Sequence, residues 1–208
     1  NVLEGTLIIP RENLLFISPF STRRKFQELI LQEMENAESG KYAAITAKMN
    51  SLEDPEIIEL RYKASNAGVI IHLLFRGFSC LIPGVPGMSE NIFITSIIDR
   101  FLEHGRIYLF ENAGDQKIFF GSADWMTRNL DRRIEVIAPV LDQDIVKEFK
   151  DILQIQLDDN VKARILDEAE TNSYVGSINK QKRIRSQYEI HAYLKEKHSL
   201  KQKNKKLI

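Results

Sequence analysis

The sequence predicts an α/β fold in which a mixed, largely parallel sheet is flanked by helices. Three short apolar runs, at 14–17, 42–49 and 69–75, have the length and composition of buried strands. Helical spacing of apolar residues fills the two gaps between them, at 21–38 and 55–67. Strands that alternate with helices in this way usually pair in parallel, which predicts a sheet with helices packed on its faces.

Residues at the ends of both predicted helices support these boundaries. Ser21 is a suitable N-cap for the first helix, and Gly40 follows the end of that helix. Pro55 lies at the start of the second helix, where its fixed φ is favourable, and Gly68 ends that helix. The first 75 residues therefore predict a strand–helix–strand–helix–strand order.

The second half of the chain predicts further elements of both kinds. Apolar runs on both sides of the turn Asn112–Asp115 predict a hairpin. A strand, a helix with an apolar face, a short edge strand and a terminal helix follow it. The ranges are 106–110 with 117–121 for the hairpin, then 134–140, 144–157, 161–166 and 183–197.

Composition and charge predict one domain with a basic end. A chain of 208 residues with 43% hydrophobic content can bury one substantial core. The formal net charge is zero, but residues 179–208 contain ten Lys or Arg and only two Glu. We expect one domain over 1–178, and a basic terminal helix and tail over 179–208 that packs on it or extends from it. The basic end could contact an inorganic polyanion, nucleic acid or an anionic membrane surface.

Other features favour an intracellular protein. The single cysteine, Cys80, cannot form an internal disulfide, and we expect it to be a small packed residue rather than a nucleophile. No apolar run approaches the roughly 20 residues that cross a bilayer, and the first residues do not resemble a signal peptide. The start at Asn1 rather than at Met predicts a fragment of a longer chain.

The hairpin region predicts a site for phosphate groups. His104 stands at the entrance of one hairpin strand, two residues before Arg106, and Gly121 and Ser122 end the other strand. Imidazole can transfer a proton or attack phosphorus near neutral pH, and arginine binds phosphate oxygens with paired donors. Alone, His104 would more often be a surface or capping residue, so its neighbours carry the argument.

Arginines after the hairpin have two interpretations. Arg133 opens the next predicted strand and is expected to point inward, toward the site. Arg128, Arg132 and Arg133 could instead form a solvated face paired with Asp124, Asp131 and Glu135, the interpretation we favour for Arg132.

Strand ends add further candidates at the same edge of the sheet. Arg76 follows the third predicted strand, and Lys48 and Asn50 lie at the end of the second. Ligands of α/β sheets bind beyond the carboxyl ends of strands, so these side chains should gather near His104 and Ser122. For Lys48 a simple surface position is equally compatible with the sequence.

The motifs themselves resemble the phospholipase D superfamily signature. That signature reads His-x-Lys, four residues, Asp, and then Gly-Ser-x-Asn. This chain has the same order with three departures, namely Arg106 for lysine, Glu111 for aspartate and Asp124 for asparagine.

The same departures resemble one branch, the long polyphosphate kinases of bacteria. The resemblance rests on the runs 76–84, 89–92, 101–104 and 122–131, and it extends from about Leu14 to Tyr193. It implies the C-terminal catalytic domain of such an enzyme, with a phospholipase D-like fold. Such an enzyme reversibly transfers the terminal phosphate of ATP to polyphosphate through a phosphohistidine.

The resemblance also implies roles for individual residues. The nucleophilic histidine of the family lies in a Lys-Ile-His-Ala-Lys run of the preceding domain, and this sequence contains no such run. His104 would serve as the catalytic residue of this domain, and would bind the phosphates together with Arg76 and Arg133. The other expected phosphate contacts lie at the same edge of the sheet and are Lys48, Asn50 and Ser122. Magnesium would arrive with ATP, and its protein ligands are unknown.

The resemblance implies partners and a location as well. We expect ATP or ADP, polyphosphate, the remaining domains of the same chain and further copies in a homo-oligomer. No nucleic-acid partner is expected. The expected location is the cytoplasm, with peripheral contact to the inner membrane face as a second option. The rival functions are a phospholipase D-type phosphodiesterase or nuclease with His104 as nucleophile, and a noncatalytic polyanion-binding module.

Overall fold

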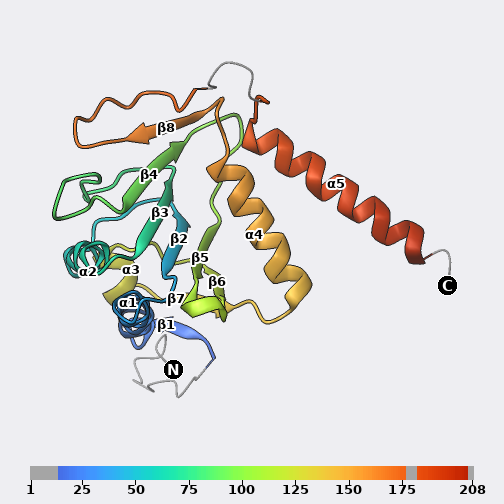
Figure 1. Cartoon of the computed structure of the whole chain (residues 1–208). Coiled ribbons are helices and arrows are strands. Elements are labelled where there is room, and N and C mark those ends of the chain that lie inside the picture. The colour runs from blue at the N-terminus through green and yellow to red at the C-terminus, as the bar shows by residue number, and fades with distance from the viewer. Residues whose placement is uncertain (1–13, 177–181, 206–208) are drawn as a thin grey trace.

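An open eight-stranded sheet forms the centre of the computed structural model, which describes residues 14–176 and 182–205, with side chains through 199. The strand order is β1-β7-β6-β5-β2-β3-β4-β8. Helices α1, α2 and α3 cover one face of the sheet, whereas α4 covers the other face (Figure 1). The first turns of α5 pack against α4. None of the described helices is long and apolar enough to cross a membrane.

The predicted elements are confirmed with small shifts at their ends, except that the terminal helix runs to Lys205 rather than ending at 197. The first half contains β1 (Phe16–Ser18), α1 (Thr22–Glu38), β2 (Ala44–Met49), α2 (Pro55–Asn66), β3 (Ile70–Phe75) and β4 (Ile92–Ile97). The second half contains β5 (Arg106–Phe110), β6 (Lys117–Gly121), α3 (Thr127–Asp131), β7 (Glu135–Pro139), α4 (Gln143–Leu157), β8 (Ala163–Leu166) and α5 (Ser186–Lys205). The sequence analysis missed β4 and α3. The expected boundary at 178/179 lies outside the described residues.

The pairing pattern corrects one expectation. The α/β class and the mixed sheet are confirmed, but only β2–β3 and β3–β4 pair in parallel. The other five pairings are antiparallel. In the second half a short turn joins β5 to β6, and two strands joined by so short a turn can only pair antiparallel. The strand–helix alternation of the first half does not extend to these strands.

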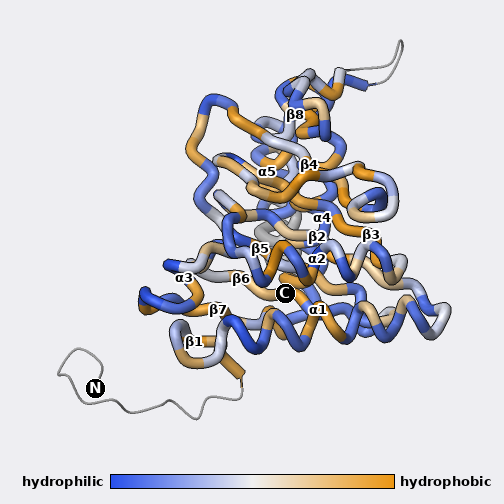
Figure 2. The backbone as a smooth tube through the Cα atoms, turned by 90° about the vertical axis from the view of Figure 1, so that its left-hand side faces the viewer, coloured by the Kyte–Doolittle hydropathy of each residue, from blue (hydrophilic) through white to orange (hydrophobic). Residues whose placement is uncertain are grey.

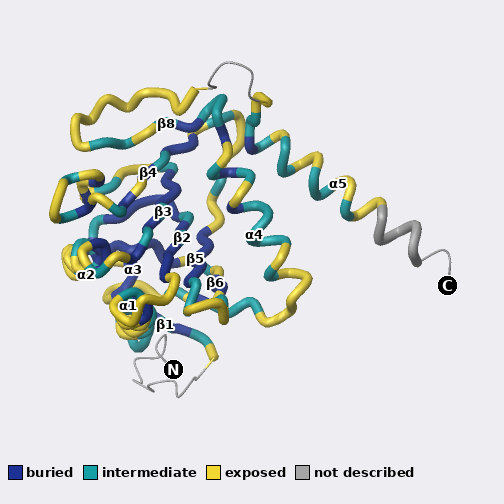
Figure 3. Tube along the Cα trace, viewed as in Figure 1, coloured by how far each residue is buried: buried dark blue, intermediate teal, exposed yellow. Residues whose placement is uncertain are grey.

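Two cores lie on opposite faces of the sheet, and β5 contributes to both. Tyr108 and Phe110 belong to the core under α1 and α2, while Ile107 and Leu109 belong to the core under α4. This alternation follows the two-residue period of a strand. Figure 2 shows hydrophobic segments along the strands, and Figure 3 shows the same segments buried. Arg106 shares the side of Tyr108, as expected, and is buried at the strand entrance.

The positions of Cys80 and His72 in the structure differ in how far each is packed. Cys80 was expected to be packed, but it is exposed, because it lies in the loop between β3 and β4 rather than in a strand. His72 lies within β3 and stacks on Phe93 with ring centroids 5.2 Å apart. A histidine inside an apolar strand is expected to be packed rather than to act as a ligand, and this position confirms that expectation for His72.

Arg23 ties three helices together beneath the sheet edge. Its guanidinium binds Asp54, the N-cap of α2, at 2.6 Å, and Asp131, the last residue of α3, at 2.6 Å. Burial acts to raise the pKa of Asp54, but hydrogen bonds from Arg23 and from the Ile57 amide lower it overall. The position of α3, which follows the site strand, is therefore fixed by α1 and α2.

Arg61 is a buried cation without a hydrogen-bond acceptor among the described residues. It lies on α2 with 0% exposure, and none of its three guanidinium nitrogens has a partner there. Its guanidinium carbon lies 3.8 Å from the centroid of the Trp125 ring. Burial lowers the pKa of Arg61, because the charged form is poorly solvated in the core. A cation–π contact is worth about 2 kcal/mol, whereas desolvation of an ion costs several kcal/mol, so the desolvation cost dominates.

We therefore expect Arg61→Leu to stabilise the fold. Replacing an unpaired buried cation by an apolar side chain should raise the free energy of unfolding by roughly 1–4 kcal/mol. Lys63→Leu, on the exposed side of the same helix, is the control and should change it by less than about 0.5 kcal/mol. Urea unfolding at pH 7 measures both changes. A loss of stability in Arg61→Leu would show that the cation has a partner that offsets its burial.

Candidate active site

A cavity of about 670 Å³ opens at one edge of the sheet. Asn50 follows β2 and Arg76 follows β3, so both lie at the carboxyl ends of parallel strands. Because β5 runs antiparallel to β2, its start, next to His104, lies at the same edge. The end of β6 joins them because Gly121 pairs with Arg106. The cavity is lined by Asn50, Ser51, Arg76, Gly77, His104, Arg106, Gly121, Ser122, Asp124, Arg128, Asn129, Arg133 and Glu135.

The carboxylate of Asp124 organises the floor of this cavity. It is 3% exposed and accepts hydrogen bonds from Arg106 Nε at 3.0 Å and Arg106 Nη2 at 3.2 Å. The backbone nitrogen of Asn50 donates to it at 2.8 Å, and Asn50 Nδ2 does so at 3.1 Å. The residue before it is also fixed, since the Tyr108 hydroxyl donates to the Ala123 carbonyl. Burial raises the pKa of Tyr108, which keeps that hydroxyl protonated as a donor.

Asn50 transmits this arrangement to Arg76. Its Nδ2 faces Asp124, so its Oδ1 faces the opposite way and accepts from Arg76 Nε at 3.0 Å and Nη2 at 2.7 Å. No carboxylate pairs with Arg76 within residues 14–176 and 182–199. The guanidinium is therefore oriented by a neutral amide and keeps its full positive charge for a ligand.

His104 is exposed at the mouth of the cavity. Its Nδ1 lies 3.4 Å from Arg76 Nη2, and its carbonyl oxygen accepts from Arg106 Nη1 at 2.8 Å. Since an arginine can only donate, Nδ1 is the acceptor and the proton of the neutral ring is on Nε2. That N–H can donate to a phosphate oxygen or pass on its proton.

Two further arginines line the same cavity. Arg128 and Arg133 are exposed, and neither forms an ion pair with any described carboxylate. The alternative in which these arginines pair with Asp124, Asp131 and Glu135 is wrong, since Asp124 binds Arg106. Asp131 binds Arg23, and Glu135 accepts from Asn129 Nδ2 at 2.7 Å. Arg133 reaches the cavity from an exposed position rather than from the interior.

Arg128 is a candidate that the sequence analysis left open between the site and a solvated face. The missed element α3 decides between them, because this helix turns Arg128 toward the cavity. A helical signal at Thr127–Asp131 could have placed it, but five residues are too few for periodicity to indicate a helix. Arg132 is exposed and does not line the cavity.

Ser122 and Lys48 differ in their positions. Ser122 lines the cavity, and its Oγ accepts from the Val136 amide at 3.2 Å, which leaves the hydroxyl proton available to a ligand. Lys48 lies outside the cavity lining and forms an ion pair with Glu103 at 3.1 Å. Its charge is thus balanced within the protein, and direct phosphate binding by Lys48 stays a prediction.

Two glycines allow the close contacts around the cavity. A Cβ at Gly121 would collide with the Val136 carbonyl of the neighbouring strand. A Cβ at Gly77 would lie 2.8 Å from the Asn50 carbonyl, to which the Gly77 amide donates at 2.7 Å. Only glycine permits these approaches, so both residues help to bring Asn50 and Ser122 to the cavity.

The acidic groups at this site do not fit a resident divalent cation. Both oxygens of Asp124 accept from Arg106 and Asn50, and Glu135 accepts from Asn129. Within the described ranges there is no group of three His, Cys, Asp or Glu that could hold a metal ion. Magnesium requires free oxygen ligands in near-octahedral geometry, which these engaged carboxylates do not offer.

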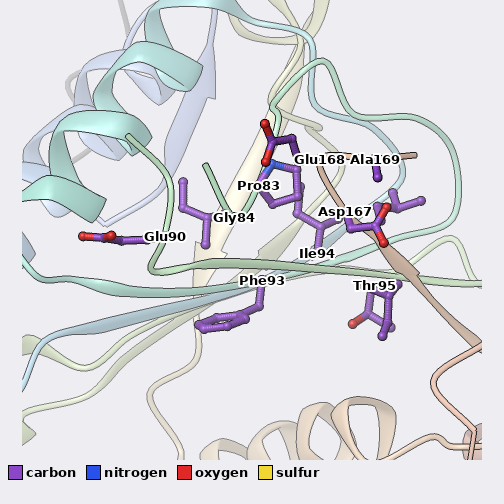
Figure 4. A pocket seen from close by; sticks show the side chains of 12 residues that line it. Pro83, Gly84, Glu90, Phe93, Ile94, Thr95, Asp167, Glu168 and Ala169 are labelled. Atoms are coloured by element: carbon purple, nitrogen blue, oxygen red, sulfur yellow. The ribbon is translucent and has the colours of Figure 1, made fainter. Parts of the chain in front are cut away.

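A second cavity, of about 690 Å³, lies at the β4–β8 edge (Figure 4). Its charged groups are carboxylates, namely Glu90, Asp167 and Glu168, and most of the remaining lining is apolar. Negative charge disfavours phosphate, so this cavity does not match the expected ligand. The cavity beside His104 combines unpaired arginines with an imidazole and is the candidate active site.

Comparison of sequences gives a consistent family. The family model described as polyphosphate kinase C-terminal domain 2 matches residues 15–187. The chain is 50% identical over 191 residues to a polyphosphate kinase of Vibrio vulnificus, and this alignment covers 91% of the chain and 27% of the relative. It is 45% identical over 181 residues to a polyphosphate kinase of Escherichia coli, and that alignment covers 87% of the chain and 26% of the relative. The chain thus spans about a quarter of the length of these curated relatives.

Comparison of structures agrees with the sequences. The crystal structure of polyphosphate kinase from Porphyromonas gingivalis matches 96% of this chain and 30% of its own, with a TM-score of 0.91 and 41% identity. The phospholipase D family member Nuc from Salmonella typhimurium matches 74% of this chain with a TM-score of 0.50 and 14% identity, which shows a shared fold alone. The chain therefore belongs to the polyphosphate kinase family, as the second C-terminal domain, and has a phospholipase D-like fold.

Proposed function

We propose that this chain is the part of a polyphosphate kinase that binds the phosphates during reversible transfer between ATP and polyphosphate. The observation that carries the proposal is one cavity with three arginines, Arg76, Arg128 and Arg133, that have no carboxylate partner among the described residues. His104 lies beside them. The names of the relatives support the activity, and the cavity supplies the groups that such a transfer needs.

The chemistry of phosphoryl transfer explains why cations suffice. Negative charge spreads over the oxygens of the transferred phosphoryl group, so positioning and charge neutralisation provide most of the rate enhancement. Arg76 and Arg133 neutralise those oxygens from two sides of the cavity. His104 donates from Nε2 to a phosphate oxygen, and its ring can also hand a proton to the departing group.

The phosphate-accepting histidine is supplied by another domain of the same protein. Its nitrogen takes the terminal phosphoryl group of ATP and releases ADP, and a terminal oxygen of polyphosphate then takes the group from that nitrogen. ATP enters as its magnesium complex, since the carboxylates of this cavity are engaged. The remaining partners are other domains and further copies of the chain, in the cytoplasm or at the inner membrane face.

A phosphodiesterase function is less well supported by the site. The phospholipase D signature places a free lysine where this chain has Arg106. Here the Arg106 guanidinium binds Asp124 with two nitrogens and the His104 carbonyl with the third. A cation that is neutralised by a buried carboxylate, with a hydrogen bond from each of its three nitrogens, has little charge to offer a phosphodiester. Whether the full protein contains a second histidine site distinguishes the kinase from this rival and from a noncatalytic module.

This 208-residue chain alone should not synthesise polyphosphate. The expected nucleophilic histidine lies outside it, and the four histidines of the sequence do not occur in the family's nucleophile motif. Labelled ATP with magnesium, supplied to the chain and to the full-length protein that contains it, measures the difference. Robust synthesis by the chain alone would contradict the proposal that another domain supplies the nucleophilic histidine.

Alanine in place of Arg76 or Arg133 should remove charge stabilisation in the transition state. In the full-length protein we expect kcat to fall about a hundredfold or more in each variant, with an unchanged melting temperature. Arg132→Ala is the matched control, because Arg132 is exposed and outside the cavity lining. Near-normal turnover in both test variants would return these arginines to a solvated surface role.

Substitution of His104 separates its two proposed roles. His104→Ala should nearly abolish transfer in both directions without a change in melting temperature, because the side chain is exposed. Glutamine can donate a hydrogen bond but cannot transfer protons near pH 7. Activity retained in His104→Gln would therefore identify phosphate binding as the main role. Full activity in the alanine variant would refute a catalytic role.

A further inference from the structure

The position of His104 depends on the backbone that carries it. Within the described residues, the only hydrogen bond of its imidazole is the 3.4 Å contact with Arg76, which is long for an N–H···N bond. The segment 98–105 that precedes β5 is irregular and contains exposed apolar residues such as Phe101 and Leu102. Contacts outside the cavity must therefore hold this segment in place.

Gln187, in the first turn of α5, makes three of these contacts. Its Oε1 accepts from the Phe101 amide at 2.9 Å, and its Nε2 donates to the Phe101 carbonyl at 2.8 Å. The same Nε2 donates to Glu103 Oε1 at 2.9 Å. One side chain thus binds both backbone groups of Phe101 and the carboxylate directly before His104.

Glu103 joins this contact to the rest of the site. Its Oε2 accepts from Gln156 of α4 and from Lys48 of β2 at 3.1 Å. Lys48 Nζ also lies 3.4 Å from the Gly105 carbonyl, on the other side of His104. The residues before and after His104 are therefore both anchored, by charge-assisted bonds that lie outside the cavity lining.

The start of α5 is itself fixed to the domain. Arg185 binds Asp99 at 2.8 and 2.6 Å, and its hydrogen bond lowers the pKa of that carboxyl group. The Ser186 amide donates to Asp159, a buried carboxylate between α4 and β8, at 2.7 Å. Farther along, α5 stays on α4, because Tyr193 donates to Asp151 at 2.7 Å and Lys197 binds Glu148 at 2.8 Å, and its last turns extend away from the domain (Figure 1). Gln187 is thus a rigid support rather than part of a free helix.

We propose that Gln187 is a positioning residue, which holds His104 at the cavity through Phe101 and Glu103. The inference rests on the proposed function in that His104 contacts the phosphates. It assigns to the terminal helix a role in transfer, although no residue of that helix through 199 lines the cavity. It also gives Lys48 a task in the same support, through its ion pair with Glu103.

The test compares Gln187→Leu with His191→Leu in the full-length protein. His191 lies on the same helix, is exposed and makes no hydrogen bond among the described residues. We expect kcat of Gln187→Leu to fall roughly tenfold to a hundredfold, since small displacements of catalytic groups have effects of that size. KM for ATP and the melting temperature should stay near the wild-type values. The control variant should match wild type in all three.

Trypsin cleavage gives a readout that does not depend on activity. Arg100 is exposed, and the bond after it leads to Phe101, whose backbone Gln187 holds. Loss of those hydrogen bonds should raise the cleavage rate at this bond about tenfold in Gln187→Leu, because local opening becomes easier. The rate in His191→Leu should not change.

A reciprocal exchange tests whether the contact itself matters. Gln187→Glu places two carboxylates in contact and should lower kcat, whereas Glu103→Gln in the same chain restores one amide–carboxylate pair. The double variant should recover part of the kcat lost in Gln187→Glu.

Two results would overturn the inference. The first is wild-type kcat and wild-type cleavage in Gln187→Leu. The second is a loss of kcat with unchanged cleavage after Arg100, because the loss would then arise elsewhere. If the wild-type protein makes no polyphosphate, the proposed function fails, and the cleavage rates still decide whether Gln187 holds the segment.

Discussion

The buried carboxylate of Asp124 is the interaction on which the site depends. It holds Asn50 and Arg106, and these two residues determine the positions of Arg76 and of the His104 backbone. Removing one member of a buried, hydrogen-bonded ion pair costs about 3–5 kcal/mol, because the other charge stays buried without a partner. The site is therefore preorganised by the core of the sheet before any phosphate arrives, which is the condition for strong electrostatic stabilisation.

The cations around the cavity fall into two groups with different tasks. Arg106 and Lys48 are paired with Asp124 and Glu103, so they hold the structure together but add little net charge. Arg76, Arg128 and Arg133 line the cavity without an ion pair in the described part of the chain, so their charge acts on the ligand. A phosphate chain carries a charge on each unit, and several separate guanidiniums suit such a ligand better than one cluster.

Local sequence patterns predicted most of the helices and strands and several residues of the cavity lining. They did not predict which distant segments pair with one another. The alternation along Arg106–Phe110 and the rule that ligands bind at strand ends were enough to bring Asn50, Arg76 and His104 together. The sequence could not show that Arg23 takes Asp131, 108 residues away, and thereby leaves Arg128 unpaired. Nor could it show that β5 inserts beside β2 in antiparallel orientation, in the middle of the sheet. Both depend on contacts between segments whose separation along the chain carries no local signal.

Two of the three departures from the phospholipase D signature, Arg106 and Asp124, make physical sense as a pair. A lysine opposite an asparagine would leave one free positive charge on the cavity floor, suited to a single phosphodiester. Arg106 opposite Asp124 forms a neutral pair joined by two hydrogen bonds, at 3.0 and 3.2 Å. The floor loses its free charge but gains rigidity, and the positive potential moves outward to Arg76, Arg128 and Arg133. An anion that enters such a cavity meets its binding charge along the walls, which is the arrangement that a chain of phosphates, rather than one isolated group, can use.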